Sequence, residues 1–147
     1  MLYPYSGDHH YVVTSGKGHL DIDAYACCLG LVDFLTRAGL SSEFVSCAPL
    51  NASVPEVIQK SYPRDQKIFP PHKQTKFIVC DVSEPDFFDP VVKSDQIFEV
   101  IDHHFGFESY WQSQADFSDI RPVAACASLI VERFSRQSLQ PDQGIAN

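Results

Sequence analysis

The sequence predicts an α/β domain of three layers, in which a mainly parallel sheet of about five strands carries helices on both faces. Apolar, β-branched segments alternate with segments whose apolar residues recur every three or four positions, which is typical of alternating strands and helices. The strand segments are continuous apolar runs, as in the buried strands of parallel sheets. The 147 residues contain no linker and no internal repeat, so a single Rossmann-like domain is expected.

The first strand and the first helix are the clearest elements. A strand is predicted at Tyr11–Thr14, where a β-branched run ends in a tight loop that contains two glycines. A helix is predicted at Asp21–Gly39, because its apolar side chains recur at helical spacing. Asp21 or Asp23 can cap its start, and Gly39 suits its end.

A second strand and helix follow. The strand is predicted at Glu43–Cys47, and the helix at Ser53–Tyr62, with Ser53 as N-cap and a proline in the first turn. The polar segment Pro63–Thr75 holds three prolines and predicts a surface loop.

Two apolar strands dominate the middle of the chain. They are predicted at Lys76–Cys80 and Ile97–Ile101. The segment Ser83–Lys93 between them is rich in proline and aspartate and predicts a short helical stretch.

The last third of the chain begins with an aromatic loop, Phe105–Asp119, followed by a short strand near Asp116–Ile120. A helix is predicted at Pro122–Gln137, where apolar residues recur on one side. Pro141–Asn147 predicts the start of a further element.

The composition limits the classes of function. The chain has 19 acidic and 11 basic side chains, for a formal charge of −8, and 13 of the acidic residues are aspartate. This balance argues against a broad face for long nucleic acid but allows a small anionic substrate held through metal ions. No apolar run approaches the roughly 18 residues of a membrane span, and the first ten residues resemble no signal peptide. A cytoplasmic protein is therefore expected.

Cysteine usage fits that compartment. The five cysteines form no CxxC pair, which argues against a zinc ribbon or a thioredoxin-type site. Most of them lie in apolar segments and are predicted to be buried, reduced thiols. They are Cys27, Cys28, Cys47, Cys80 and Cys126.

Carboxylates follow three of the predicted strands. Because the carboxyl ends of parallel strands meet at one edge of the sheet, these side chains are expected to lie together. Clustered carboxylates repel each other unless cations neutralise them, and carboxylates with imidazoles suit Mn²⁺, Mg²⁺, Zn²⁺ or Fe²⁺. Two such ions can activate a water for attack on a phosphoryl group. The predicted cluster consists of Asp21, Asp23, Asp81, Asp102, His103 and His104.

Simpler interpretations exist for each residue alone. A single aspartate after the first strand can be only a helix cap, and Asp81 can be only a turn residue. The tripeptide Asp-His-His also occurs twice: Asp102-His103-His104 follows a strand, whereas Asp8-His9-His10 follows a polar segment and is interpreted as part of a polar N-terminus. The joint occurrence at three strand ends favours a metal site.

These residues resemble the motifs of the DHH phosphoesterase superfamily. The segment 11–35 with Asp21-Ile22-Asp23 resembles the first motif, Asp81 the second, and Asp102-His103-His104 the third, while the small residues of 124–132 are similar to the helix that follows. The superfamily includes manganese-dependent (family II) inorganic pyrophosphatases, exopolyphosphatases, RecJ-type exonucleases, and hydrolases of cyclic dinucleotides and short oligoribonucleotides. The resemblance covers nearly the whole chain.

The resemblance implies a site with two metal ions, Mn²⁺ or else Mg²⁺ or Co²⁺, that hydrolyses phosphoester or phosphoanhydride bonds. In the implied assignment, Asp21 and Asp23 each bind one ion, Asp81 bridges both ions, His103 binds a metal, His104 faces the substrate phosphate, and Asp102 supports and orients an imidazole.

Two departures from the family pattern stand out. Lys17 occupies the position where many members carry a metal-binding histidine; it can contact phosphate, and His19 is a substitute ligand. Family members also continue with a fourth motif and a C-terminal substrate-binding domain. Residues 1–147 are therefore expected to be the N-terminal catalytic part of a longer protein and to bind metal poorly and lack activity in isolation, and the resemblance allows a homodimer.

Three functions are open at this point. Hydrolysis of a small phosphate-rich substrate, such as pyrophosphate or polyphosphate, is favoured over phosphodiester cleavage of short oligonucleotides or cyclic dinucleotides. A non-catalytic DHH module that keeps the fold without the full site is the alternative, supported by Lys17. A flavodoxin-like binder is a weaker hypothesis, because the loop at 15–18 is too short for a phosphate-binding glycine motif.

Overall fold

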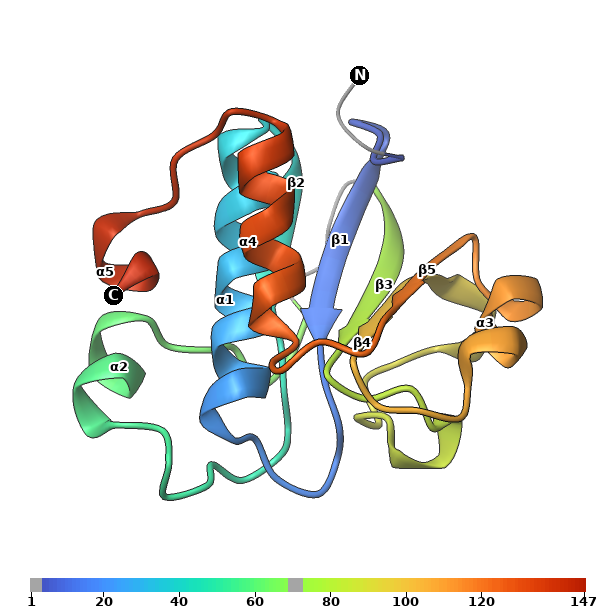
Figure 1. Ribbon diagram of the computed structural model, residues 1–147, viewed down its shortest axis with the longest axis horizontal. Coiled ribbons are helices and arrows are strands. Elements are labelled where there is room, and N and C mark those ends of the chain that lie inside the picture. The colour runs from blue at the N-terminus through green and yellow to red at the C-terminus, as the bar shows by residue number, and fades with distance from the viewer. Residues whose placement is uncertain (1–3, 69–72) are drawn as a thin grey trace.

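Five parallel strands form one sheet in the order β2-β1-β3-β4-β5 (Figure 1). The computed structural model describes residues 4–68 and 73–147. The prediction of a mainly parallel sheet of about five strands is confirmed. The strands are β1 (His9–Thr14), β2 (Ser41–Phe44), β3 (Gln74–Cys80), β4 (Ile97–Asp102) and β5 (Phe117–Ile120).

Helices cover both faces of this sheet (Figure 1). The long helices α1 (Ile22–Arg37) and α4 (Ala127–Arg136) pack side by side on one face, where Gly30 permits close approach: a Cβ there would lie 3.1 Å from Ile130 Cγ2. The opposite face carries α3 (Glu108–Gln114), whose Trp111 packs in a second apolar cluster with Val79 and Val100. The three-layer architecture predicted from the sequence is therefore present.

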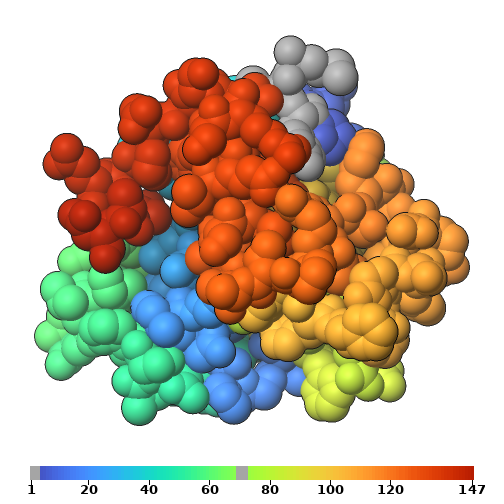
Figure 2. Space-filling view, viewed as in Figure 1, coloured from blue at the N-terminus to red at the C-terminus, as the bar shows by residue number. Residues whose placement is uncertain are grey.

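Two shorter helices extend the side that carries α1. They are α2 (Glu56–Ser61) and α5 (Gln143–Ala146). A largely apolar groove of about 1010 Å³ lies between α1, α2, α4 and α5, and Figure 2 shows it as a hollow between α4 and the two short helices. No helix in the described residues is long and apolar enough to cross a membrane.

The strand order reverses beside β1, and this reversal positions the site. The chain leaves β1 for β2 on one side, whereas β3, β4 and β5 lie on the other side. The loops after β1 and β3 therefore diverge at the carboxyl edge of the sheet, which is where open α/β sheets bind ligands. Asp81 directly follows β3, and Asp102 is the last residue of β4.

Several element boundaries differ from the sequence prediction. The strand predicted at Glu43–Cys47 is β2 at Ser41–Phe44. The amide of Val45 still donates to Val13 of β1, but Val45 then forms an isolated bridge with Asp65, and the amide of Ser46 donates to Asp65. The predicted loop Pro63–Thr75 ends earlier, since β3 begins at Gln74, and part of it lies outside the described residues.

The N-cap predicted for the second helix was wrong. α2 begins at Glu56 after Pro55, without a side-chain cap. Ser53 Oγ instead accepts a hydrogen bond from the amide of Ile22 at 3.0 Å, so it serves the start of α1. This partner lies 31 residues away in the chain, and no local pattern predicts it.

The last third of the chain differs most from the prediction. α3 lies within the segment that was predicted as an aromatic loop, and its burial of a single residue, Trp111, leaves no helical repeat to recognise. α4 begins at Ala127, five residues later than the predicted Pro122, because residues 121–126 make contacts at the sheet edge. The strand near Asp116–Ile120 is confirmed as β5.

The first Asp-His-His tripeptide is not merely a polar N-terminal segment. His9 and His10 begin β1, and the His10 ring contacts Ser41 Oγ at 2.7 Å and Glu43 Oε1 at 3.0 Å. This copy therefore lies where a strand begins, whereas Asp102-His103-His104 lies where β4 ends. In a parallel sheet these are opposite edges, so the two copies are separated by the length of the strands.

Four of the five free cysteines are buried, whereas Cys47 is exposed, which corrects the prediction for that residue. We expect one thiol per native chain to react rapidly with a thiol reagent such as Ellman's reagent, because the other four exclude the reagent. All five are expected to react in denaturant. Rapid reaction of a second thiol in the native protein, or of one thiol in Cys47→Ser, would contradict this packing. The buried thiols are Cys27, Cys28, Cys80 and Cys126.

A buried ion pair joins the sheet to α4. Arg133 and Glu99 are 2% and 1% exposed, and Arg133 Nη2 lies 2.7 Å from Glu99 Oε1. The hydroxyl of Tyr5 donates to Glu99 Oε2 at 2.5 Å and accepts from Arg133. The register of β3 against β4 shifts between Phe77, which pairs with Ile97, and Ile78, which pairs with Glu99. The pair is therefore enclosed between β4 and the inner side of α4.

Candidate metal centre

Asp81 lies at the centre of the predicted site. It follows β3 in the left-handed region, with φ of 63°, a conformation that aspartate tolerates better than most residues. Its side chain is 7% exposed, and Oδ1 accepts no hydrogen bond from the described residues. Burial, together with the nearby carboxylates Asp23 and Asp21, raises the pKa of Asp81 to about 8, against the opposing effect of His103. A bound cation would offset the unfavourable free energy of the buried negative charge on Asp81.

The His103 ring presents one nitrogen to Asp81. Its Nδ1 lies 2.9 Å from the carbonyl oxygen of Val123, and because a carbonyl only accepts, Nδ1 carries the proton of this hydrogen bond. In the neutral ring, Nε2 is then a lone-pair acceptor. Nε2 lies 3.1 Å from Asp81 Oδ1 and 3.5 Å from Asp23 Oδ2. Three electron-rich atoms thus converge from three segments of the chain.

Asp102 and His104 form a pair beside this point. Asp102 is fully buried, and its Oδ1 lies 2.6 Å from His104 Nδ1 while accepting from the amide of His103 at 2.8 Å. His104 is 60% exposed, and its ring centre lies 4.4 Å from that of His103. The carboxylate therefore holds the inner nitrogen of a ring whose outer side faces solvent. Ligand atoms of Asp81, Asp102, His103 and His104 all lie within 4.8 Å of one another.

Asp23 contacts His103 and also binds the start of α4. Its Oδ2 accepts from the amide of Cys126 at 2.9 Å, and its Oδ1 accepts from the amide of Ala127 at 3.0 Å. Amides at a helix N-terminus favour an anionic partner, so the start of α4 holds this carboxylate in place beside His103. The sequence analysis missed this role, since the partners lie 103 and 104 residues away.

The remaining predicted residues lie outside the group of four. Asp21 is exposed and caps α1, accepting from the amide of Ala24 at 2.8 Å. Lys17 and His19 are both exposed. The amide of Lys17 donates to the Phe87 carbonyl at 2.8 Å, and its ammonium lies 5.9 Å from the centre of the Phe87 ring. The ligand or phosphate roles of these three residues remain predictions.

Comparison with protein families supports what this geometry indicates. The model of the DHH family, N-terminal domain, matches residues 12–146. The chain belongs to the DHH family. A comparison with curated proteins finds no significant match.

A solved structure shares the fold of this DHH domain. It is the crystal structure of an exopolyphosphatase-related protein from Bacteroides fragilis, with a TM-score of 0.63 and 14% sequence identity. The match covers 86% of this chain but only 39% of that protein, so the DHH domain spans well under half the length of its structural neighbour. At this identity the likeness concerns the fold alone.

The donors of the DHH domain fit a divalent cation of the Mn²⁺ or Mg²⁺ type. Carboxylate oxygens and one imidazole suit such ions better than the thiol-selective metals. Two buried carboxylate oxygens, Asp81 Oδ1 and Asp102 Oδ2, have no hydrogen-bond partner among the described residues. An orphaned buried oxygen is costly unless a cation or a water satisfies it. The carbonyl of Val123 supports the same site, because it orients the His103 ring. This contact was not predicted from the sequence.

Proposed function

We propose that this DHH domain is the catalytic part of a metal-dependent phosphohydrolase that cleaves phosphoanhydride bonds in a small, phosphate-rich substrate such as pyrophosphate or polyphosphate. One observation carries the proposal. Nε2 of His103 lies 3.1 Å from Asp81 Oδ1 and 3.5 Å from Asp23 Oδ2, beside a solvent-facing His104. Membership of the DHH family supports the class of reaction. The printed description of the structural neighbour, an exopolyphosphatase-related protein, supports the substrate class.

Two Mn²⁺ ions, or Mg²⁺ or Co²⁺ in their place, are the proposed cofactors. Bound divalent ions would supply positive charge for the phosphate oxygens and lower the pKa of a bound water. The ligands proposed for them are Asp21, Asp23, Asp81 and His103, with Asp81 placed between the two ions. Burial and the neighbouring carboxylates disfavour the charged form of Asp81 without metal, which supports its role as a ligand shared by the two ions.

Side chains of the domain would orient the substrate. Asp102 holds Nδ1 of His104, which leaves Nε2 to face the phosphate. Lys17, exposed on the loop after β1, adds a point charge for a phosphate oxygen, and His19 is a substitute ligand.

A C-terminal domain of a longer chain is the proposed partner, and it would supply further substrate contacts. The apolar groove between α1, α2, α4 and α5 offers a surface for packing, with Val131 65% exposed at its edge. The five free thiols suit a reducing compartment, so we place the protein in the cytoplasm. The net charge of −8 disfavours long nucleic acids, and a homodimer is compatible with the proposal.

A non-catalytic DHH module is the second candidate. Lys17 favours it, because a lysine replaces a histidine that ligates metal in many family members and a cationic ammonium cannot ligate. Such a module would retain the fold and the Asp102–His104 pair while failing to hold both ions.

Metal-dependent hydrolysis distinguishes the two candidates. We expect the protein with Mn²⁺ to release phosphate from pyrophosphate or polyphosphate, and EDTA to abolish the reaction. Mn²⁺ at about 100 times its Kd should stabilise the fold by about 2.7 kcal/mol, measured by thermal unfolding. His104→Ala should lose hydrolysis while retaining this stabilisation. Absence of hydrolysis of pyrophosphate, polyphosphate and a short oligonucleotide, with or without metal binding, would overturn the hydrolase and favour the module, whereas Mn²⁺-dependent hydrolysis would overturn the module.

A further inference from the structure

The segment 121–126, which joins β5 to α4, sets the orientation of the His103 ring. The amide of Arg121 donates to the carbonyl of Asp102 at 3.1 Å, and the amide of Val123 donates to the carbonyl of Arg121 at 2.9 Å. The carbonyl of Val123 then accepts from His103 Nδ1 at 2.9 Å. Which nitrogen of His103 faces Asp81 therefore depends on where this short segment lies.

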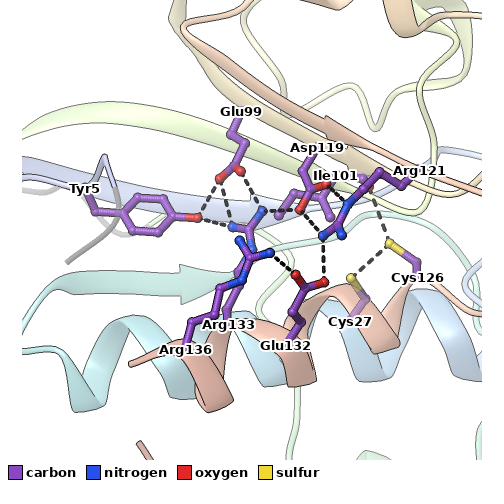
Figure 3. A network of polar contacts seen from close by, with 10 residues as sticks. All are labelled: Tyr5, Cys27, Glu99, Ile101, Asp119, Arg121, Cys126, Glu132, Arg133 and Arg136. Atoms are coloured by element: carbon purple, nitrogen blue, oxygen red, sulfur yellow. Dashed lines mark hydrogen bonds and ion pairs between the residues drawn. The ribbon is translucent and has the colours of Figure 1, made fainter. Parts of the chain in front are cut away.

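Arg121 clamps this segment by its side chain. Its Nε lies 2.6 Å from Asp119 Oδ1 and its Nη2 lies 3.1 Å from Asp119 Oδ2, a bidentate pair (Figure 3). The same Nη2 lies 2.8 Å from Glu132 Oε2 on α4. One guanidinium thus joins the end of strand β5 to the second turn of helix α4, across the segment between them.

One of the two carboxylates that hold Arg121, Asp119, is itself anchored in the interior. Asp119 Oδ2 lies 3.2 Å from Nη2 of Arg133, whose guanidinium is buried against Glu99 (Figure 3). Glu132 is also paired with Arg136, one turn later on α4. Because Asp119 is only 10% exposed, the clamp is attached to the packed core and not to a mobile surface side chain.

We propose that Arg121 is a positioning residue for metal binding: it holds residues 121–123 so that the Val123 carbonyl keeps the proton of His103 on Nδ1 and presents Nε2 to Asp81. The inference rests on the proposed function in one respect, that His103 ligates a metal. The side chain of Arg121 pairs with Asp119 and Glu132 and with none of the four residues of the group. Arg121 acts through the carbonyl of Val123. Its guanidinium is not buried, because the side chain is 41% exposed.

A matched pair of variants separates positioning from stability. Arg121→Gln and Arg136→Gln each remove one cationic partner of Glu132, but only Arg121 belongs to the segment that contacts His103. Both are expected to lower the melting temperature in EDTA by similar, small amounts, because partly exposed ion pairs contribute little to stability. Only Arg121→Gln is expected to weaken Mn²⁺ binding, by about 10- to 100-fold in Kd, as other changes behind a metal-binding histidine do.

Two further measurements test the route through His103. Arg121→Lys should restore Mn²⁺ affinity in part, because a lysine keeps the charge but not the bidentate fork. In the Mg²⁺-loaded protein, ring ¹⁵N shifts should show the proton of His103 on Nδ1 in the wild type, and a mixture of ring states in Arg121→Gln. Equal Mn²⁺ affinities for Arg121→Gln and Arg136→Gln would overturn the inference. If the wild-type chain binds no Mn²⁺, the proposed function fails instead, so the two failures are distinct.

Discussion

Replacing Asp81 by asparagine is expected to abolish tight Mn²⁺ binding and hydrolysis while making the metal-free protein more stable. The change is isosteric, and asparagine adopts the left-handed conformation of this position as readily as aspartate. Metal affinity should fall by more than about 100-fold, because loss of groups behind the ligands alone costs about 10- to 100-fold. Isothermal titration with Mn²⁺ measures the loss.

The gain in stability follows from the raised pKa of Asp81, which burial and the neighbouring Asp23 and Asp21 lift to about 8. Between the ordinary pKa of an aspartate and pH 8, the folded metal-free protein holds a proton that the unfolded chain has lost. Stability in EDTA therefore falls as pH rises through this window. The asparagine variant lacks this dependence and should be about 1–3 kcal/mol more stable at pH 8.

Urea unfolding in EDTA at pH 5 and pH 8 tests the stability change. Asp95→Asn is a suitable control, because it makes the same chemical change at an exposed residue, and it should alter neither Mn²⁺ affinity nor the pH dependence. An Asp81→Asn protein that binds Mn²⁺ like the wild type would refute the ligand assignment. A variant less stable than the wild type at pH 8 would show that the carboxylate has a partner in the metal-free fold.

Replacing Arg133 by methionine is expected to destabilise the fold by about 3–5 kcal/mol, the usual cost of leaving a buried charge without its partner. Glu99 is 1% exposed and lies 2.7 Å from Arg133 Nη2. In the variant, the Tyr5 hydroxyl still donates to Glu99, but it cannot neutralise the carboxylate. Asp119 also loses a cationic partner at 3.2 Å. Equilibrium unfolding in urea measures the loss.

The double variant Glu99→Leu/Arg133→Met separates a missing charge from a missing contact. Well-packed apolar side chains often replace a buried ion pair at little cost, so the double variant should recover most of the lost stability. Arg136→Met is the control, since Arg136 lies in the same helix and its side chain is 56% exposed. If the double variant is less stable than Arg133→Met alone, packing and not charge dominates at this position.

The fold class could be predicted because its signals are local. The apolar runs of β3 and β4 and the helical repeat of α1 each arise within a few residues, and Asp21 caps α1 through an amide three residues away. α3 escaped prediction because it buries only Trp111. The start of α4 escaped because its first amides bind Asp23, which is more than 100 residues distant.

The sequence predicts which residues lie at the candidate site better than it predicts the contacts they make there. Asp81 and Asp102-His103-His104 follow strands of a parallel sheet, so topology alone brings them to one edge. The Val123 carbonyl that orients His103 carries no side-chain signal, and Arg121 resembles any surface arginine. Both act through contacts that exist only after β5 and α4 have packed.

The sequence by itself determined the alternation of strands and helices, the family, and the residues that can meet at the sheet edge. Periodicity, capping and motif spacing are properties of neighbouring residues, so they are present in the unfolded chain. Only the tertiary structure decided that Asp23 binds the start of α4, that Glu99 meets Arg133, and that His103 presents Nε2 to Asp81. Each of these contacts joins groups far apart in the chain, and their energies depend on burial, which only packing creates.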